Sequence, residues 1–353
     1  MRKIEEVISQ IRPADRTAME AARAHWDSRC KPLCGFGALE EMVTRLAGIQ
    51  GTADPQILRR DFLVFGADNG VVAEGVSQTG REVTRQVMEN MTRGRSSICV
   101  MARHLGARVV PVDIGLALPP RTDLVRDLCV RRGTANIAEG PAMEREECLL
   151  AMARGADLAV ELAGEGTDIF VAGEMGIGNT TTAAACACAL LDLAPGVCTG
   201  RGAGLSAEGL KRKTRAVERA LAVNRPDKTD AVDVITKVGG LDIAAMTGAF
   251  LGAACARRAI FADGLISILS ACLAVMLCPE AKDYILASHE SSEPACRALL
   301  QRLGLQPALY AGMHTGEGTG GAAALGLLDQ ALALYRELPA FGEGGVEPYV
   351  HLS

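Results

Sequence analysis

Residues 168–182 read DIFVAGEMGIGNTTT, and this stretch decides the fold. Its first part, residues 168–172, is an apolar run of strand length without polar alternation, which is typical of a parallel strand buried on both faces. The glycine-rich segment that follows opens a helix. The stretch therefore predicts a strand, a tight turn and a helix, which together are one βα unit.

The same alternation recurs along most of the chain. Strand-length apolar runs lie at residues 62–66, 108–113, 168–172, 259–263, 284–287 and 307–310. Segments with helical periodicity lie at residues 82–104, 144–163, 206–223, 242–257, 264–277 and 320–335. Alternating strands and helices imply βαβ units with right-handed crossovers. We therefore predict an α/β fold, a three-layer Rossmann-like parallel sheet with ligands outside the carboxyl ends of its strands.

The two ends of the chain lack strand patterns. A helix is predicted over residues 4–25 and a second one near residues 38–47, separated by proline and glycines. We expect both ends to associate as a small helical subdomain. The predicted division is 1–50 for its first part, 51–325 for the large α/β domain and 326–353 for its second part.

The charge balance argues against two classes of partner. Among 353 residues, 37 Lys and Arg stand against 42 Asp and Glu, a net charge of -5, so no basic excess exists to neutralise nucleic acid. The longest apolar run, residues 265–278, falls short of the ~20 residues that span a bilayer. Acidic residues near the start do not fit a signal peptide. We expect a cytoplasmic protein with neither nucleic-acid nor membrane partners.

The cysteines do not form an evident disulfide framework. Their spacing is unpaired, and several lie in apolar segments: Cys186, Cys188, Cys255 and Cys272. We expect reduced thiols. Cys30 and Cys34, with His25 upstream, are the one combination that resembles metal ligands, but no second pair completes a tetrahedral set, so no metal is expected.

The glycine-rich turn at residues 173–182 is suited to phosphate. Backbone N–H groups at the positive end of a helix bind anions. The spacing nearly fits a Walker loop, but Asn179 stands where that loop needs lysine, which disfavours an ATPase. A dinucleotide fingerprint would need glycine at Thr181. An ordinary βα turn remains the alternative.

A second glycine-rich turn, residues 313–321, surrounds the single carboxylate of Glu317. Glycines leave room for a substrate, and low polarity can raise the pKa of a carboxylate towards that of a general base. A first-turn glutamate that favours the helix dipole is an equally good interpretation.

Three further polar segments have candidate binding roles. Residues 66–80 combine glycines and polar groups after the first strand, and residues 202–206 precede a helix that bears Lys213. Residues 288–294 resemble a helix start, where serines serve as caps or phosphate donors. His289, taken alone, is more often structural than catalytic.

Taken together, these motifs resemble the nicotinate-nucleotide:dimethylbenzimidazole phosphoribosyltransferase family. The resemblance runs in the family's order through nine strings that cover nearly the whole chain: 31–40, 67–72 with 82–86, 113–115, 173–182, 202–213, 239–243, 263–264, 288–294 and 316–320. It implies transfer of 5-phosphoribose from nicotinate mononucleotide to a nitrogen of an aromatic base, with nicotinate released and an α-riboside phosphate formed.

The resemblance also implies roles for individual residues. Glu317 is implied as the general base and Glu174 as a supporting carboxylate. The phosphoribosyl group is expected at Gly176, Gly178, Asn179, Thr180, Gly202, Lys213, Asp263 and Ser291. The incoming base is expected at Asn69, Ser77, Gln86 and Thr315. No metal or cofactor is implied, and the family's active enzyme is a homodimer.

The departures from the family pattern concern the incoming base. The family commonly has histidine at the position of Asn69, a Ser-x-Tyr-Pro type loop at residues 77–80, and an Arg-Leu pair at residues 314–315. These changes leave the acceptor open. Two rival functions are a catalytically idle nucleotide-binding regulator and a Rossmann oxidoreductase, of which the second lacks the dinucleotide fingerprint.

Overall fold

The structure, a computed structural model, describes residues 2–349, and at its centre is a sheet of six parallel strands. The strands are β1 (Arg60–Ala67), β2 (Arg108–Gly115), β3 (Arg126–Asp127), β4 (Ile169–Met175), β5 (Ala259–Ala262) and β6 (Ile285–Ala287). Their spatial order, β3-β2-β1-β4-β5-β6, is that of the Rossmann fold. The chain order reverses between β1 and β4, and ligands of such sheets bind at this switch point.

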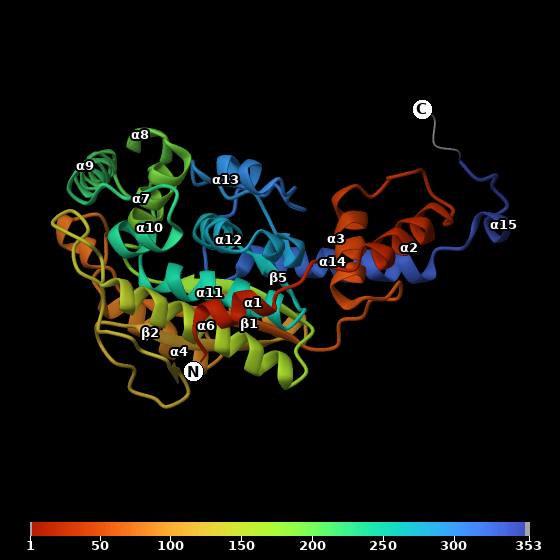
Figure 1. Cartoon of the computed structure of the whole chain (residues 1–353), viewed down its shortest axis with the longest axis horizontal. Helices are drawn as coiled ribbons and strands as arrows, with labels where there is room; N and C mark the ends of the chain where they lie inside the picture. Colours follow the sequence, from red (N-terminus) through yellow and green to blue (C-terminus); the bar gives the residue numbers. More distant parts are fainter. Residues whose placement is uncertain (1, 350–353) are drawn as a thin grey trace.

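Helices cover both faces of the sheet (Figure 1). A Cβ added to Gly66 of β1 would lie 2.9 Å from Met88 of α4 (Glu82–Thr92). A Cβ added to Gly115 of β2 would overlap Leu241 of α11 (Leu241–Cys255). Gly115 pairs with Ala67, the residue after Gly66, and successive strand residues point to opposite faces. The helix–sheet–helix sandwich predicted from the sequence is thus confirmed.

Glycines let two helices of one outer layer lie in direct backbone contact. A Cβ on Gly155 of α6 (Arg145–Gly164), or on Gly248 or Gly252 of α11, would overlap a main-chain oxygen of the facing helix. The other helices are α1 (Ile4–Gln10), α2 (Arg16–Asp27), α3 (Ala38–Gln50), α5 (Ser97–His104), α7 (Asn179–Leu191), α8 (Pro195–Cys198), α9 (Ala207–Asn224), α10 (Ala231–Val238), α12 (Leu265–Leu277), α13 (Cys296–Leu303), α14 (Thr319–Glu337) and α15 (Phe341–Gly344), with 3₁₀ helices η1 (Gly70–Glu74) and η2 (Pro279–Tyr284).

Helices from both ends of the chain lie together on one side of the molecule (Figure 1). There α3 contacts α2 and α14, and the ring of Trp26 meets that of Tyr335 edge-on at 5.0 Å. The Tyr335 hydroxyl donates to the carbonyl oxygen of Ala53 at 2.6 Å. In contrast, α1 packs against α6 and α11, and α14 runs unbroken past residue 325. The division of the chain into domains stays a prediction.

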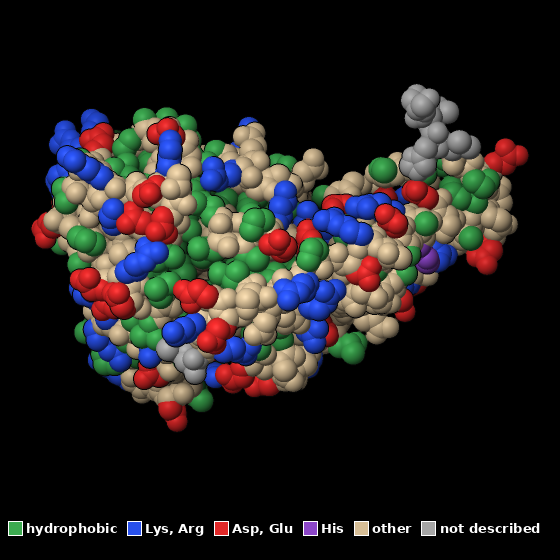
Figure 2. All heavy atoms as spheres, viewed as in Figure 1, with side chains coloured by type: hydrophobic (Ala, Val, Ile, Leu, Met, Phe, Trp, Pro, Cys, Tyr) green, Lys and Arg blue, Asp and Glu red, His purple; other side chains and the backbone are tan. Residues whose placement is uncertain are grey.

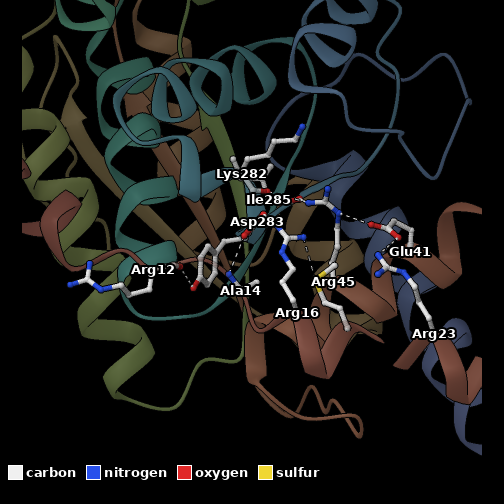
Figure 3. Close-up of polar contacts among 11 residues, drawn as sticks. Arg12, Ala14, Arg16, Arg23, Glu41, Arg45, Lys282, Asp283 and Ile285 are labelled. Carbon is white, nitrogen blue, oxygen red and sulfur yellow. Dashed lines mark hydrogen bonds and ion pairs between the residues drawn. The ribbon is translucent and has the colours of Figure 1, made fainter. Parts of the chain in front are cut away.

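Polar contacts join this helical end to the edge of the sheet (Figure 3). Arg45 of α3 donates to the carbonyl oxygens of Lys282 and Ile285 at 3.1 and 3.3 Å. The carboxylate of Asp283 accepts from the amide of Ala14 at 3.0 Å. Because Ile285 begins β6, these contacts fix the helical end against the edge strand.

The helix predicted over residues 4–25 is wrong in its continuity. The structure has two helices, α1 and α2, with Pro13 between them. Proline lacks the N–H that a continuous helix needs. Asp15 then caps α2 by accepting from the amide of Ala18 at 3.0 Å, as a helix N-cap does.

The strand predicted at residues 307–310 is also wrong. Within this segment only Leu309 forms a bridge, with His289, beyond the end of β6. Pro307 cannot donate to a ladder, and the neighbouring segment already turns into the loop that carries Glu317. The sequence did not predict β3 or α10, both of which are short.

The face of the molecule drawn in Figure 2 shows no large region of one charge among the described residues. Figure 2 shows basic and acidic side chains intermingled on the face displayed. Among residues 2–349, no helix is long and apolar enough to cross a membrane. All twelve cysteines are free, and Cys186, Cys188 and Cys272 are buried, whereas Cys255 is partly exposed.

Candidate active site

A cavity of about 370 Å³ lies at the carboxyl ends of β4 and β5. Its walls come from α4, the turn between β4 and α7, the first turn of α12, and the loops around residues 291 and 315. Parallel strands bring these distant segments to one edge of the sheet. The predicted site residues that line it are Glu174, Gly176, Asn179, Thr180, Gly202, Asp263, Ser291, Thr315 and Glu317.

Glu174 is held near the end of β4, where its carboxylate is almost enclosed by protein. The side-chain amide of Asn179 donates to it. Burial raises the pKa of Glu174 well above its usual value, and the nearby carboxylates of Asp242 and Asp263 raise it further. The site therefore favours a protonated Glu174, which can donate as well as accept a hydrogen bond.

Glu317 lies in a turn whose backbone conformation is unusual. Its φ is +60°, and the flanking Gly316 and Gly318 have φ of +80° and +88°. Left-handed conformation at a residue other than glycine is strained and is common at functional sites. The Glu317 carboxylate accepts from the Ile98 amide at 3.2 Å, in the first turn of α5.

The two glutamates are adjacent. The amide of Glu317 donates to the carbonyl oxygen of Glu174 at 3.2 Å. A Cβ added to Gly316 would lie 2.6 Å from a carboxylate oxygen of Glu174. Glycine at this position thus lets the two acidic side chains share one wall of the cavity.

Asp263, directly after β5, connects the sheet to the Glu317 turn. Its carboxylate accepts from the amides of Gly318 and Gly321 at 3.2 and 2.9 Å, at the start of α14. Burial raises the pKa of Asp263, while these hydrogen bonds and His289 oppose the rise. Asp263 thereby holds the backbone that follows Glu317.

Lys213 lies behind the part of the cavity lining that Thr180 and Gly202 form. Its fully buried ammonium donates to the Thr180 hydroxyl at 2.9 Å and to the Gly200 carbonyl oxygen at 3.0 Å. A Cβ on Gly202 would lie 3.3 Å from Nζ of Lys213. Burial lowers the pKa of Lys213 to about 8, opposed by Glu293.

Two helices begin at this end without side-chain caps. The N-cap residue of α7 is Gly178 and that of α12 is Gly264. The first residues of both helices line the cavity. The positive ends of helices, with the charge of Lys213 beside one of them, suit a phosphate group.

Four predicted site residues lie away from the cavity lining besides Lys213. A Cβ on Gly178 would meet Val72, and Asn69 is fully buried with an amide that has no hydrogen-bond partner. Ser77 accepts from the Thr79 amide at 3.2 Å within its own loop. Gln86 is exposed on α4. The structure does not bring these side chains into contact with the cavity.

The sequence missed the apolar part of the cavity. The apolar side chains in its lining are those of Val83, Val87, Met175, Ile177, Leu265 and Ile266. Val83 and Val87 are four residues apart, the spacing that places two side chains on one face of a helix. This spacing, next to Gln86 in the sequence, could have indicated that the two valines and not Gln86 face the cavity. The cavity thus offers an apolar surface next to the two carboxylates. Among residues 2–349, no three His, Cys, Asp or Glu side chains gather as metal ligands would.

Two adjacent carboxylates, helix starts suited to phosphate and a Rossmann-like sheet are together typical of a nucleotide-processing transferase site. A family model described as "Phosphoribosyltransferase" matches residues 11–346, and the chain belongs to this family. A relative from Geobacter metallireducens is 42% identical over 98% of this chain and 99% of its own length. A relative from Geobacter sulfurreducens is 43% identical over the same shares. Both are named nicotinate-nucleotide--dimethylbenzimidazole phosphoribosyltransferase.

Solved structures agree with this assignment. A crystal structure of CobT from Thermus thermophilus matches with a TM-score of 0.88 and 40% sequence identity. The match covers 94% of this chain and 100% of that one. The family and the α/β fold expected from the sequence are thus confirmed.

Proposed function

We propose that the protein transfers 5-phosphoribose from nicotinate mononucleotide to a lower-ligand base in cobamide biosynthesis. The acceptor is 5,6-dimethylbenzimidazole or a related benzimidazole or purine. The observation that carries this proposal is the adjacent pair Glu174 and Glu317 in one cavity with the uncapped helix starts, with Lys213 behind Thr180. The names of the relatives support the same reaction.

This reaction needs one proton acceptor. The bond between the anomeric carbon and the pyridinium nitrogen breaks, and nicotinate leaves as a neutral ring nitrogen with the electron pair. The azole nitrogen attacks from the opposite face, which inverts the anomeric carbon to the α-riboside. The attacking nitrogen is the unprotonated one, and the N–H proton on the other ring nitrogen of the azole passes to Glu317, a general-base step. The raised pKa of Glu174 favours its protonated form, which would not compete with Glu317 for that proton.

The donor's phosphate and the acceptor base are proposed to bind at different lining residues of the cavity. The donor's phosphate goes to Thr180, Gly202 and Ser291, with the charge of Lys213 behind them. The acceptor is proposed to bind against the apolar side chains of the lining, near Thr315. The active form is proposed to be a homodimer, which light scattering on the purified protein tests.

The experiment is incubation of the protein with nicotinate mononucleotide and 5,6-dimethylbenzimidazole. Chromatography should show nicotinate and the α-riboside 5'-phosphate forming in equal amounts, and light scattering should give the dimer mass. Binding of the mononucleotide without nicotinate release would instead support the idle regulatory protein. Both carboxylates are retained and adjacent, which favours the enzyme.

Lys213→Ala is expected to raise the KM for nicotinate mononucleotide by about 10–100-fold, the value of a hydrogen bond or close contact to a charged group. Nicotinate riboside has no phosphate, so its KM should change little. Steady-state kinetics with both donors measures the difference. Equal weakening of both donors, or of neither, would contradict a phosphate role for Lys213.

Lys213→Met is the matched control, since it keeps most of the buried volume without the charge. It should give the same selective loss. With its pKa lowered to about 8, the wild-type lysine is charged below that pH and neutral above it. The KM for the mononucleotide should therefore rise above pH 8 in the wild type and stay flat in Lys213→Met.

Thr315→Leu is expected to increase the preference for 5,6-dimethylbenzimidazole over 5-hydroxybenzimidazole by about fivefold. Thr315 lines the cavity with its polar hydroxyl, and each methyl group that gains apolar contact contributes roughly 1 kcal/mol. Competition assays with mixed bases measure the ratio. If the wild type already prefers 5,6-dimethylbenzimidazole strongly and Thr315→Leu does not change that preference, Thr315 does not set specificity.

A further inference from the structure

His289 is a buried titratable side chain to which the reaction above gives no role. It follows β6, lines the cavity and is only 2% exposed. Its Nδ1 lies 3.0 Å from the Ser288 hydroxyl and 4.0 Å from a carboxylate oxygen of Asp263. Among residues 2–349, its other ring nitrogen, Nε2, has no hydrogen-bond partner.

The hydrogen bonds around Nδ1 determine what Nε2 can do. The Ser288 hydroxyl has one proton, and it donates this proton to the carbonyl oxygen of Asp263 at 3.2 Å. Nδ1 therefore faces two oxygens that can accept, that of Ser288 and, at 4.0 Å, a carboxylate oxygen of Asp263, and on this ground we assign the proton of the neutral imidazole to Nδ1. Nε2 consequently presents a lone pair, which accepts a hydrogen bond from a ligand.

An acceptor at this place selects one part of the donor substrate. Phosphate and the nicotinate carboxylate are themselves acceptors and offer no proton to Nε2. The ribose hydroxyls are the groups of the mononucleotide that donate. The chemistry of the ring therefore fits a ribose hydroxyl and neither anionic end of the substrate.

The position of the ring agrees with this choice. A Cβ on Gly264 would lie 3.6 Å from Nε2 of His289 and 3.7 Å from Cβ of Ser291, a residue of the phosphate end. On the other side, Asp263 binds the amide of Gly318, next to Glu317. His289 thus lies between the residues assigned to phosphate and the general base. The ribose lies between phosphate and anomeric carbon in the substrate.

The start of α14 is shaped to admit this ring. A Cβ on Gly320 would overlap Nδ1 of His289, so the imidazole and an alanine cannot occupy their places together. The glycines of the 316–321 turn therefore have two roles. Gly316 and Gly318 provide the left-handed backbone around Glu317, and Gly320 makes room for His289.

We propose that His289 is a substrate-binding residue whose Nε2 accepts a hydrogen bond from a ribose hydroxyl of the donor, with Ser288 and Asp263 positioning the ring. This inference rests on the proposed function, because it assumes a ribosyl donor in the cavity. It extends that function by naming the group that recognises the sugar.

Deoxy donors test the inference. Wild-type protein and His289→Leu are each assayed with nicotinate mononucleotide and with its 2'-deoxy and 3'-deoxy analogues. The wild type should prefer the full ribose over one deoxy analogue by about 10-fold or more, as loss of a buried partner predicts. In His289→Leu this preference should fall to about 2-fold or less. The ratio between the two proteins cancels the intrinsic reactivity of each donor.

Two further variants separate binding from packing. His289→Gln places an amide oxygen near Nε2 and should restore part of the preference. Gly320→Ala keeps the imidazole but displaces it and should lose the preference. An equal loss with all donors in His289→Leu, or an unchanged preference, overturns this inference alone. No transfer by the wild type from the mononucleotide overturns the proposed function and this inference with it.

Discussion

Glu317→Gln is expected to lower kcat for phosphoribosyl transfer by about 10²–10⁴-fold, the usual contribution of a general base. Glutamine keeps the shape of the side chain and its hydrogen bond from Ile98, but it cannot take the acceptor's proton. Nicotinate release under saturating substrates gives kcat. Calorimetric binding of nicotinate mononucleotide should remain close to the wild-type value, since the base acts on the other substrate.

Glu174→Gln is the control for this prediction. The pKa of Glu174 is raised well above its usual value, so an amide resembles the protonated form that the site favours. We expect a clearly smaller loss of kcat than in Glu317→Gln. Near-wild-type turnover by Glu317→Gln, or a larger loss in Glu174→Gln, would assign the proton to a different group.

The sequence predicted five of the six strands, all but β3, and wrongly added one at residues 307–310. A parallel strand buried on both faces is recognisable as a continuous apolar run. The apolar runs that became β1, β4 and β5 have no polar alternation, and each ends in a glycine-containing turn. The turn at residues 313–321 was recognisable for the same reason, since only glycine adopts left-handed backbone without strain. The structure shows that Glu317 itself adopts this conformation, which no sequence pattern indicated.

Side-chain direction limited what could be predicted about the site. Gln86 and Val87 are neighbours in the sequence, but on α4 the first is exposed and the second lines the cavity. Asn69 directly follows Asp68 after β1 and is nevertheless buried away from the cavity lining. A motif gives the position of the backbone, whereas the packing of neighbouring helices decides which side of it faces a ligand.

For Lys213, the sequence could not show that the side chain is buried next to the cavity. Its place on α9 after residues 202–206 indicated that one cation could reach an anion, and three adjacent basic residues offered candidates. In the structure Lys213 alone of these is fully buried, with its ammonium beside Thr180 at the cavity wall. The helical period turns Lys211 and Arg212 to solvent, which no composition argument could have decided.

The contact between β4 and the Glu317 turn predicts a second large effect. Gly173 lies within β4, and a Cβ there would come within 2.6 Å of the Gly318 amide nitrogen and 2.7 Å of the Glu317 carbonyl carbon. Both are backbone atoms, so an added methyl group must move either the strand or the turn. A displacement of the order of 1 Å at a catalytic group can cost about 10²-fold in rate.

Gly173→Ala is therefore expected to lower kcat by about 10²-fold and to destabilise the fold by about 1–3 kcal/mol, as overpacking of a buried site does. Measuring kcat at temperatures below the unfolding transition separates the loss of activity from the loss of stability. Gly196→Ala is the matched control, because a Cβ there meets no atom within 4 Å and should leave both quantities unchanged. A folded Gly173→Ala protein with wild-type kcat would mean that the Glu317 turn keeps its place without this packing. The position of Glu317 would then depend on the hydrogen bonds that Asp263 accepts from the amides of Gly318 and Gly321, and on the one that Glu317 accepts from Ile98 of α5.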